Sequence, residues 1–534
     1  MERIKELYKG DNMKKVLCFL LTLSIIAASF GVFSSNVFAD DLRDSYATVY
    51  PTIYVGGQGQ TIYDTEGNQI YPFDYMSKIT DAASDLLPVY KDALLTQDWD
   101  EFLDDIYDIF HPLFAKIALD ENGDNTTGSS IEWKWEKGEI PSYKVNGLYP
   151  IHRYYFNYDW RLDPFVVAQQ LHEYIEYILE ITGEEKVEMI GRCLGGAVAN
   201  AYLYLYDGEY IDSYLQYASS AQGALLIEKF YSGQLGLDPD LLEDFLIDNN
   251  LGLNDDIYSI IVPLATILNK TYGLDLICHA FNKTYDEIFM DILPRLMGDT
   301  YATFPGYWSM VSDNDNCFET AKQVLLYSRG YSDDSPLIKR IDDYHYNVQN
   351  KVGELYDRMQ NEKNIHISCI TKYGFSPRPY LRNANALSDE TCTVTAASNG
   401  ATTSKTVTGF LSPFTLLKAK LTGNEKYIAP DLKIDASTCL CPDTTWFIKN
   451  LLHPDFPDFI EGFMAEILND NDITVDKYEE YPQYLVYNKQ DECIVPMTKD
   501  NMFTDRRYYT TLTGAFIDLF KAIPTIIALI NQKG

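Results

Sequence analysis

The segment Lys186–Ala199, KVEMIGRCLGGAVA, constrains the fold more than any other part of this chain. Its short apolar run predicts a buried strand, Gly-x-Cys-x-Gly-Gly predicts a sharp turn, and the small residues that follow predict the start of a helix. This pattern is typical of a nucleophile elbow, in which small flanking residues let the backbones approach a strained reactive residue. Serine usually occupies that position. Gly191 and Gly195 flank Cys193 here, so the sequence predicts a cysteine nucleophile.

The segments on either side of the elbow predict a parallel sheet with helices on both faces. Aromatic and β-forming residues at 152–160 predict a strand, and Asp163 and Pro164 then predict the start of a helix that ends at Gly183. Another strand is predicted at 211–218. Strand, helix, strand, elbow and helix in this order form a βαβ series, which indicates an α/β fold with a mostly parallel, doubly wound sheet.

A long helical region interrupts the predicted sheet. From about 230 to 363 no strand signal occurs, and helices are predicted at 240–251, 256–269, 285–297 and 338–360. A helical insertion between core strands is the usual position of a cap that shields an acyl pocket. We therefore divide the chain into a signal peptide (1–39), a first core part (40–229), a helical cap (230–363), a second core part (364–503) and a C-terminal apolar helix (504–534).

The N-terminal region has the pattern of a secretory signal peptide. Two lysines precede the apolar run 16–33, and small residues lead to Ala39, so we expect cleavage after Ala39 and a secreted mature protein. The chain has 43 Lys and Arg against 78 Asp and Glu, a net charge of −35. This charge repels nucleic acid, which excludes a nucleic-acid partner, and it favours solubility. No spacing of cysteines or histidines predicts a metal site, and no cofactor is expected.

The order of residues along the chain selects the partners of the nucleophile. In elbow-based sites the acid follows the nucleophile and the histidine follows the acid. If the acid comes after the strand predicted at 364–372, His453 is the remaining histidine of the seven. Asp389, in the loop after that strand, is then the first choice as the acid. Asp491 lies in a similar loop but no histidine follows it, so it ranks second.

Two backbone amides are predicted to bind the oxyanion. The strand predicted at 48–55 ends in the glycine-rich loop 56–60, whose Gln58 amide is one candidate donor, and the amide of Leu194 after the nucleophile is the other. His453 would take the proton of Cys193 and later protonate the leaving group, while Asp389 holds the imidazole tautomer. A thiol at a helix N-terminus beside Arg192 favours the thiolate.

The segment Asn157–Pro164, NYDWRLDP, together with IGRCLGG at 190–196, resembles the lecithin:cholesterol acyltransferase and phospholipid:diacylglycerol acyltransferase family of α/β-hydrolases. The resemblance implies an α/β-hydrolase fold and cleavage of an acyl group from a lipid ester, with transfer to an alcohol or to water. Carried over by motif, Cys193 is the nucleophile and the oxyanion loop falls at 56–58. The family has His before Ser where this chain has Arg192 before Cys193, and its acid loop is more similar to the stretch around Asp491.

The function predicted from the sequence is a lipase-like acyl-ester hydrolase or O-acyltransferase that makes peripheral contact with lipid surfaces. One alternative is a catalytically silent relative that binds a surface or a lipid. A further alternative is a thioesterase or polymer synthase, since the cysteine elbow is also similar to those of dienelactone hydrolases and polyhydroxyalkanoate synthases. The apolar tail 514–530 is broken by Asp518, Lys521 and Pro524, which predicts a docking or interface-lying helix.

Overall fold

A computed structural model describes residues 48–73, 86–132 except 87, 94 and 97, 153–247, 254–502 except 385, and 512–523. The predicted signal peptide with its cleavage site after Ala39, and residues 504–511 and 524–534 of the predicted C-terminal helix, lie outside these described residues.

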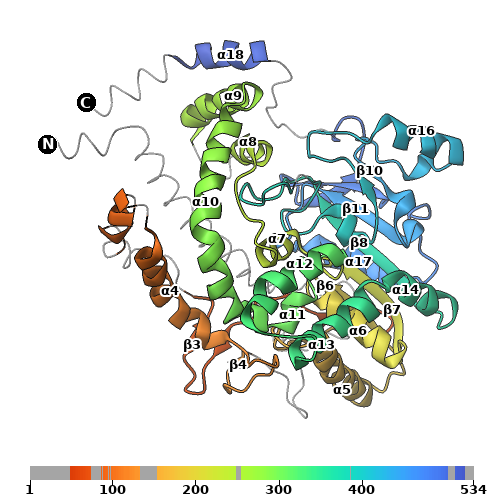
Figure 1. Cartoon of the computed structure of the whole chain (residues 1–534). Coiled ribbons are helices and arrows are strands. Elements are labelled where there is room, and N and C mark those ends of the chain that lie inside the picture. The colour runs from red at the N-terminus through yellow and green to blue at the C-terminus, as the bar shows by residue number, and fades with distance from the viewer. Residues whose placement is uncertain are drawn as a thin grey trace.

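The centre of the molecule is an eight-stranded, mostly parallel sheet in the order β13-β12-β11-β8-β7-β6-β1-β5 (Figure 1). Only β12 and β13 pair antiparallel within it. The strands of this sheet are β1 (Thr52–Val55), β5 (Arg153–Phe156), β6 (Val187–Arg192), β7 (Ile211–Tyr217), β8 (His366–Tyr373), β11 (Thr445–Lys449), β12 (Tyr484–Asn488) and β13 (Cys493–Pro496); smaller sheets contain β2 (Ile62–Tyr63), β3 (Gln69–Tyr71), β4 (Ser130–Ile131), β9 (Thr402–Thr403) and β10 (Ile434–Asp435).

Helices occupy most of the connections between these strands, so the fold is of the α/β class. They are α4 (Asp100–Phe114), α5 (Pro164–Thr182), α6 (Gly195–Tyr206), α7 (Leu225–Tyr231), α8 (Pro239–Ile247), α9 (Asp255–Lys270), α10 (Gly273–Gly298), α11 (Pro305–Trp308), α12 (Asp315–Leu325), α13 (Pro336–Tyr344), α14 (Val352–Asn361), α15 (Val394–Ala397), α16 (Pro413–Thr422), α17 (Asp458–Asn469) and α18 (Leu512–Lys521).

Successive side chains of the central strands enter two different hydrophobic cores. Met189 and Tyr214 belong to the larger core, which also contains buried residues of α5, α6 and α14. Their neighbours Ile190 and Leu215 belong to the second core, beneath α17. Because side chains alternate between the faces of a strand, both faces of the sheet are covered.

The helix predicted after the first βα turn forms as its end residues indicate. The Asp163 carboxylate accepts a hydrogen bond from the amide of Phe165, and Pro164 occupies the first turn. Gly183 ends α5 with φ of 76°, a left-handed conformation that glycine adopts without steric cost. The continuous helix predicted at 338–360 is wrong: a five-residue π-helix at 345–349 separates α13 from α14.

The helices between β7 and β8 divide into two groups. Tyr344 of α13 donates to the Ala197 carbonyl and Tyr356 of α14 donates to Asn200 Oδ1, so both helices pack on α6 in the layer that covers the sheet. In contrast, α8, α9 and α10 extend to the end of the molecule farthest from α5, where α18 packs on α9 (Figure 1). In the described part of the chain no single helix is long and apolar enough to cross a membrane; 256–270 and 273–283 reach that composition only together, with an 81° bend between them.

Candidate active site

The predicted site residues lie on loops that leave one edge of the sheet. Five parallel strands, β1, β6, β7, β8 and β11, end at this edge because parallel strands share their direction. The connections after them begin at Gly56, Cys193, Ala218, Gly374 and Asn450. In open α/β sheets, ligands bind outside the carboxyl ends of the strands, so this edge is the candidate active site.

Cys193 occupies the turn between β6 and α6 with φ of 51°, a strained conformation for a residue with a side chain. Its carbonyl accepts hydrogen bonds from the amides of Gly196 and Ser220. A Cβ atom at Gly195 would lie 2.0 Å from the Val55 carbonyl oxygen, and one at Gly196 would lie 2.0 Å from Ser219 Oγ. The turn therefore requires glycine at position 195, where the contact is with backbone, whereas at position 196 the Ser219 side chain would have to move.

The glycine-rich loop after β1 lies against this turn. A Cβ atom at Gly57 would be 2.8 Å from the Cβ and 3.4 Å from the Sγ of Cys193, so the backbone approaches the nucleophile closely. Among the described residues, the amides of Gln58 and Leu194 donate no hydrogen bond. Leu194 is also the N-cap of α6, where the helix dipole favours negative charge. Both amides are thus available to a developing oxyanion.

The NYDWR segment holds the glycine-rich loop in place. The Tyr158 hydroxyl donates to the Gly56 carbonyl at 2.7 Å, and Trp160 Nε1 donates to the Gln60 carbonyl at 3.3 Å. In the same segment, Arg161 forms a buried ion pair with Asp159, with Nη2 lying 2.6 Å from Oδ2. The most specific sequence motif of the chain therefore positions the predicted oxyanion loop, a role that its residue types alone did not reveal.

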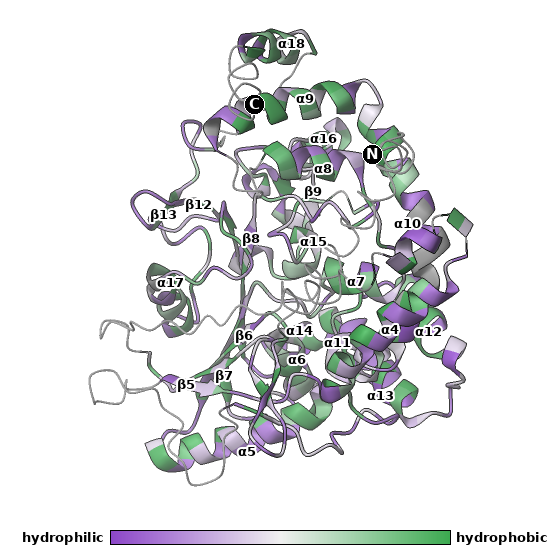
Figure 2. Ribbon diagram, turned by 90° about the vertical axis from the view of Figure 1, so that its left-hand side faces the viewer, coloured by the Kyte–Doolittle hydropathy of each residue, from purple (hydrophilic) through white to green (hydrophobic). Residues whose placement is uncertain are grey.

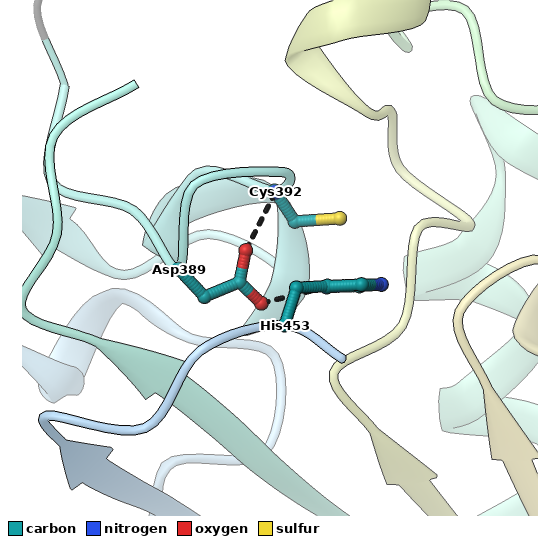
Figure 3. Close-up of side chains that lie close together, drawn as sticks. All are labelled: Asp389, Cys392 and His453. Carbon is teal, nitrogen blue, oxygen red and sulfur yellow. Dashed lines mark hydrogen bonds and ion pairs between the residues drawn. The ribbon is translucent and has the colours of Figure 1, made fainter. Parts of the chain in front are cut away.

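The side chains of Asp389 and His453 form a hydrogen-bonded pair (Figure 3). His453 Nδ1 lies 2.8 Å from Asp389 Oδ2, and the His453 amide also donates to the Asp389 carbonyl. The other carboxylate oxygen, Oδ1, accepts the amides of Thr391 and Cys392. Both side chains are buried, and His453 Nε2 makes no hydrogen bond with other described residues. This arrangement fixes Nδ1–H toward the acid and leaves Nε2 for proton transfer.

The charges of the site favour an ionised Cys193 and a protonated His453. Burial raises the pKa of the Cys193 thiol, but the nearby charge of His453, with smaller contributions from Ser220 and Arg192, lowers that pKa to about 7. Burial lowers the pKa of His453, yet the charges of Asp389 and Cys193 hold it well above its usual value. The two groups therefore stabilise each other as a thiolate and an imidazolium.

A buried lysine and a half-buried arginine anchor the loop that carries His453. Lys372 Nζ donates to the carbonyls of Leu452, His453 and Asp455 at 3.1, 2.9 and 2.5 Å, and lies 4.4 Å from the ring centre of Tyr217. Arg192 Nη2 donates to the Pro454 carbonyl at 2.9 Å. The unusual arginine before the nucleophile is thus also a link between the elbow and the histidine loop.

A second thiol, on Cys392, was not predicted from the sequence. It is fully buried and points in the same direction as the tip of the His453 ring (Figure 3). One ligand atom from each of Asp389, Cys392 and His453 lies within 4.8 Å of the others, a possible ligand set for a metal ion among the described residues. Burial raises the pKa of the Cys392 thiol to about 12, so it stays protonated. In the sequence, its position three residues after Asp389, the predicted acid, could have indicated that this thiol lies near the site.

The second-choice acid and two histidines that the chain order excluded lie elsewhere. Asp491, the second choice as acid, is exposed in the β12–β13 turn, where its carboxylate accepts a hydrogen bond from Asn488 Nδ2. His345 is buried beside Gln349 on the π-helix, and His366 begins β8 at the opposite edge of the sheet. His152 lies outside the described residues. The Asp120–Asn125 segment is a turn whose Asp124 pairs with Arg340.

Comparisons with known proteins show no family for this chain. No protein-family model and no curated protein matches it. Among solved structures, a chain of "The crystal structure of Tle4-Tli4 complex" matches with 14% identity over 61% of this chain and 75% of that chain, at a TM-score of 0.23. Similarity at that level does not indicate the fold or the function of this chain.

Proposed function

We propose that this chain is a secreted α/β-hydrolase-fold enzyme that cleaves or transfers the acyl group of a lipid ester through Cys193, Asp389 and His453. The observation that carries the proposal is the 2.8 Å bond between His453 Nδ1 and Asp389 Oδ2, with Nε2 buried and unbonded among the described residues, close to a Cys193 thiol of lowered pKa. The order in the chain, nucleophile after β6, acid after β8 and histidine after β11, is that of the α/β-hydrolases.

The proposed reaction has two halves. The Cys193 thiolate attacks the ester carbonyl carbon, and the amides of Gln58 and Leu194 stabilise the resulting oxyanion. Protonated His453 gives its proton to the departing alkoxide, which leaves as an alcohol and generates a thioester on Cys193. In the second half, His453 removes a proton from water or from an acceptor alcohol, which attacks the thioester and releases the acid or the new ester together with the thiolate.

The lipid character of the substrate is inferred from the family resemblance and from the inserted helices. The NYDWR segment, which the proposed family relation rests on, holds the oxyanion loop through Tyr158 and Trp160. Helices α8 to α10 are placed between core strands, where a cap shields an apolar acyl chain from water. A thioester reacts readily with alcohols, so an acyl acceptor other than water is compatible with the site.

The test is to mix the mature chain with a short activated acyl ester and to measure the intact mass. We expect a transient acyl adduct on the wild-type protein and none on Cys193→Ala. Cys317→Ala is a matched control, because Cys317 is also a half-buried free thiol but lies on α12. Acylation of Cys193→Ala, or no adduct and no ester turnover by a folded wild-type protein, would refute the proposal and favour the silent alternative.

Transfer and hydrolysis are separated by the products from a phospholipid substrate. Vesicles that contain a labelled phospholipid and a sterol or diacylglycerol acceptor give a labelled neutral ester by transfer and a labelled fatty acid by hydrolysis. The ratio of these two products decides the reaction class, and Cys193→Ala provides the background.

A further inference from the structure

Helix α16 presents an apolar face to solvent instead of to the protein core. Phe414, Leu417 and Leu421 are 77%, 54% and 78% exposed. Their spacing of i, i+3 and i+7 places them on one stripe of the helix. Ala419, on the opposite side, is the buried residue of this helix. An ordinary surface helix has the reverse arrangement, with its large apolar residues inward; here no part of the chain that the structure describes covers the stripe.

The helix itself is well formed, so the exposed stripe is not the result of fraying. The Ser412 hydroxyl accepts the amide of Thr415 at its N-terminus, and Pro413 occupies the first turn. Gly423 ends the helix with φ of 74° and donates to the Ala419 carbonyl. Start and stop signals are therefore both satisfied locally, and α16 keeps its shape without packing its large side chains.

Lysines flank the apolar stripe on both sides. At the helical repeat of 3.6 residues per turn, Lys418 and Lys420 lie about 70° and about 90° from the centre of the stripe. Both are exposed, and neither forms an ion pair with another described residue. Residues 405–433 contain five lysines against Glu425 and Asp431, in a chain whose net charge is −35. Lys433 is buried and Lys426 pairs with Asp443 and Asp476, so the exposed lysines of this segment with no ion pair to a described residue are Lys405, Lys418 and Lys420.

Other exposed apolar side chains lie at the same end of the molecule. Tyr272 and Leu276, at the bend between α9 and α10, are each 72% exposed, and Phe520 of α18 is 68% exposed. Two perpendicular views place α9, α18 and α16 at this one end, although they are far apart in sequence (Figures 1 and 2). α16 itself belongs to the same β8–β11 connection as Asp389.

We propose that α16 docks the protein on a lipid surface that contains anionic headgroups. An interfacial helix inserts large apolar side chains below the headgroups, while lysines at the border of the stripe extend to the phosphates. The charge pattern selects this occupant: an acidic chain is repelled by anionic lipid everywhere except where its lysines are concentrated. The inference rests on the surface of α16 alone and is independent of the proposed catalytic activity.

The experiment measures binding of the full chain to vesicles of phosphatidylcholine, with and without phosphatidylglycerol, by cosedimentation. We expect wild-type protein to bind the anionic vesicles and Phe414→Ser/Leu421→Ser to lose at least about tenfold in partition coefficient. Lys418→Gln/Lys420→Gln should lose about 25-fold on anionic vesicles, since each lysine near such a surface contributes about fivefold. Leu205→Ser on α6, also exposed but distant from α16, is the matched control and should bind like wild type.

Two outcomes would overturn the proposal: wild-type protein that binds neither vesicle, or a Phe414→Ser/Leu421→Ser variant that binds as tightly as wild type. If sedimentation velocity shows a wild-type dimer that this variant dissociates, with no vesicle binding, the stripe joins two copies of the chain instead. Turnover of a water-soluble short ester should be unchanged in all these variants. Its absence in a vesicle-binding wild-type protein would refute the proposed activity but not the docking surface.

Discussion

Asp389→Asn tests the electrostatic coupling of the site, because it removes one buried charge and keeps the shape of the side chain. The Asp389 carboxylate is the strongest of the charges that raise the pKa of His453. Without it, burial makes the imidazole neutral near pH 7. Cys193 then loses the cation that lowers its pKa, and burial returns that pKa to 9 or above.

The expected change in the alkylation rate follows from the shift in the pKa of Cys193. A pKa of about 7 leaves roughly half of the Cys193 thiol ionised at pH 7. A pKa of about 9 leaves roughly one part in a hundred, so the rate of alkylation at pH 7 should fall about 50-fold, which corresponds to about 2.3 kcal/mol. A lowered pKa favours the ionised form of an acid. The Cys193 thiolate is therefore the main form above about pH 7 in the wild-type protein and only above about pH 9 in the variant.

The assay is the pH dependence of iodoacetamide alkylation, followed by mass spectrometry on the peptide that contains Cys193. Asp491→Asn is the matched control, since that acid lies exposed in the β12–β13 turn and should leave the profile unchanged. An identical midpoint in Asp389→Asn and wild type would refute the coupling. A shift in Asp491→Asn would return the acid role to the second candidate.

Three further substitutions test the support of the site. Gly195→Ala brings a methyl group to 2.0 Å from the Val55 carbonyl oxygen. We expect the free energy of unfolding, measured with urea, to fall by about 1–3 kcal/mol. An unchanged unfolding midpoint would contradict the close approach. Tyr158→Phe removes the hydrogen bond that holds the Gly56 carbonyl of the predicted oxyanion loop. We expect kcat for ester turnover to fall about tenfold with little change in KM. A change in KM alone would indicate a role in substrate binding instead. Lys372→Met removes a donor from three carbonyls of the histidine loop. The Leu452 carbonyl keeps the Asp455 amide and the Asp455 carbonyl keeps the Tyr217 hydroxyl, so the His453 carbonyl is the one that loses its donor. We expect a loss of about 1–3 kcal/mol in the same unfolding assay, and an unchanged stability would show that other contacts hold the loop.

The parts of the site that sequence could predict are those that depend on local rules. A residue flanked by glycines after a buried strand indicates the turn at Cys193, and Asp163 with Pro164 indicates the start of α5. The acid and the histidine needed only the chain order of elbow-based sites, and the structure joins the two residues selected that way, Asp389 and His453. Each of these predictions requires no knowledge of which distant segments meet.

The parts that sequence could not predict depend on tertiary contacts. Cys392 lies beside the His453 ring because two loops from different strands converge, whereas its position three residues after Asp389 indicates only that it belongs to the loop of the predicted acid. The hydrogen bond from Tyr158 to Gly56 spans 102 residues. The π-helix at 345–349 interrupts a regular apolar period, which local propensity continues without a break. Packing decides each of these features.

The spread of the proposed triad over three strands of the sheet has a consequence for biosynthesis. Asp389 is 64 positions before His453, and His453 is reached only when β11 lies beside β8. A nascent chain that has already completed β6 and the cysteine turn therefore has neither the proton acceptor nor the charge that ionises the thiol. Contacts this distant in sequence form late in folding, so the proposed site is assembled only when most of the chain has been synthesised and folded.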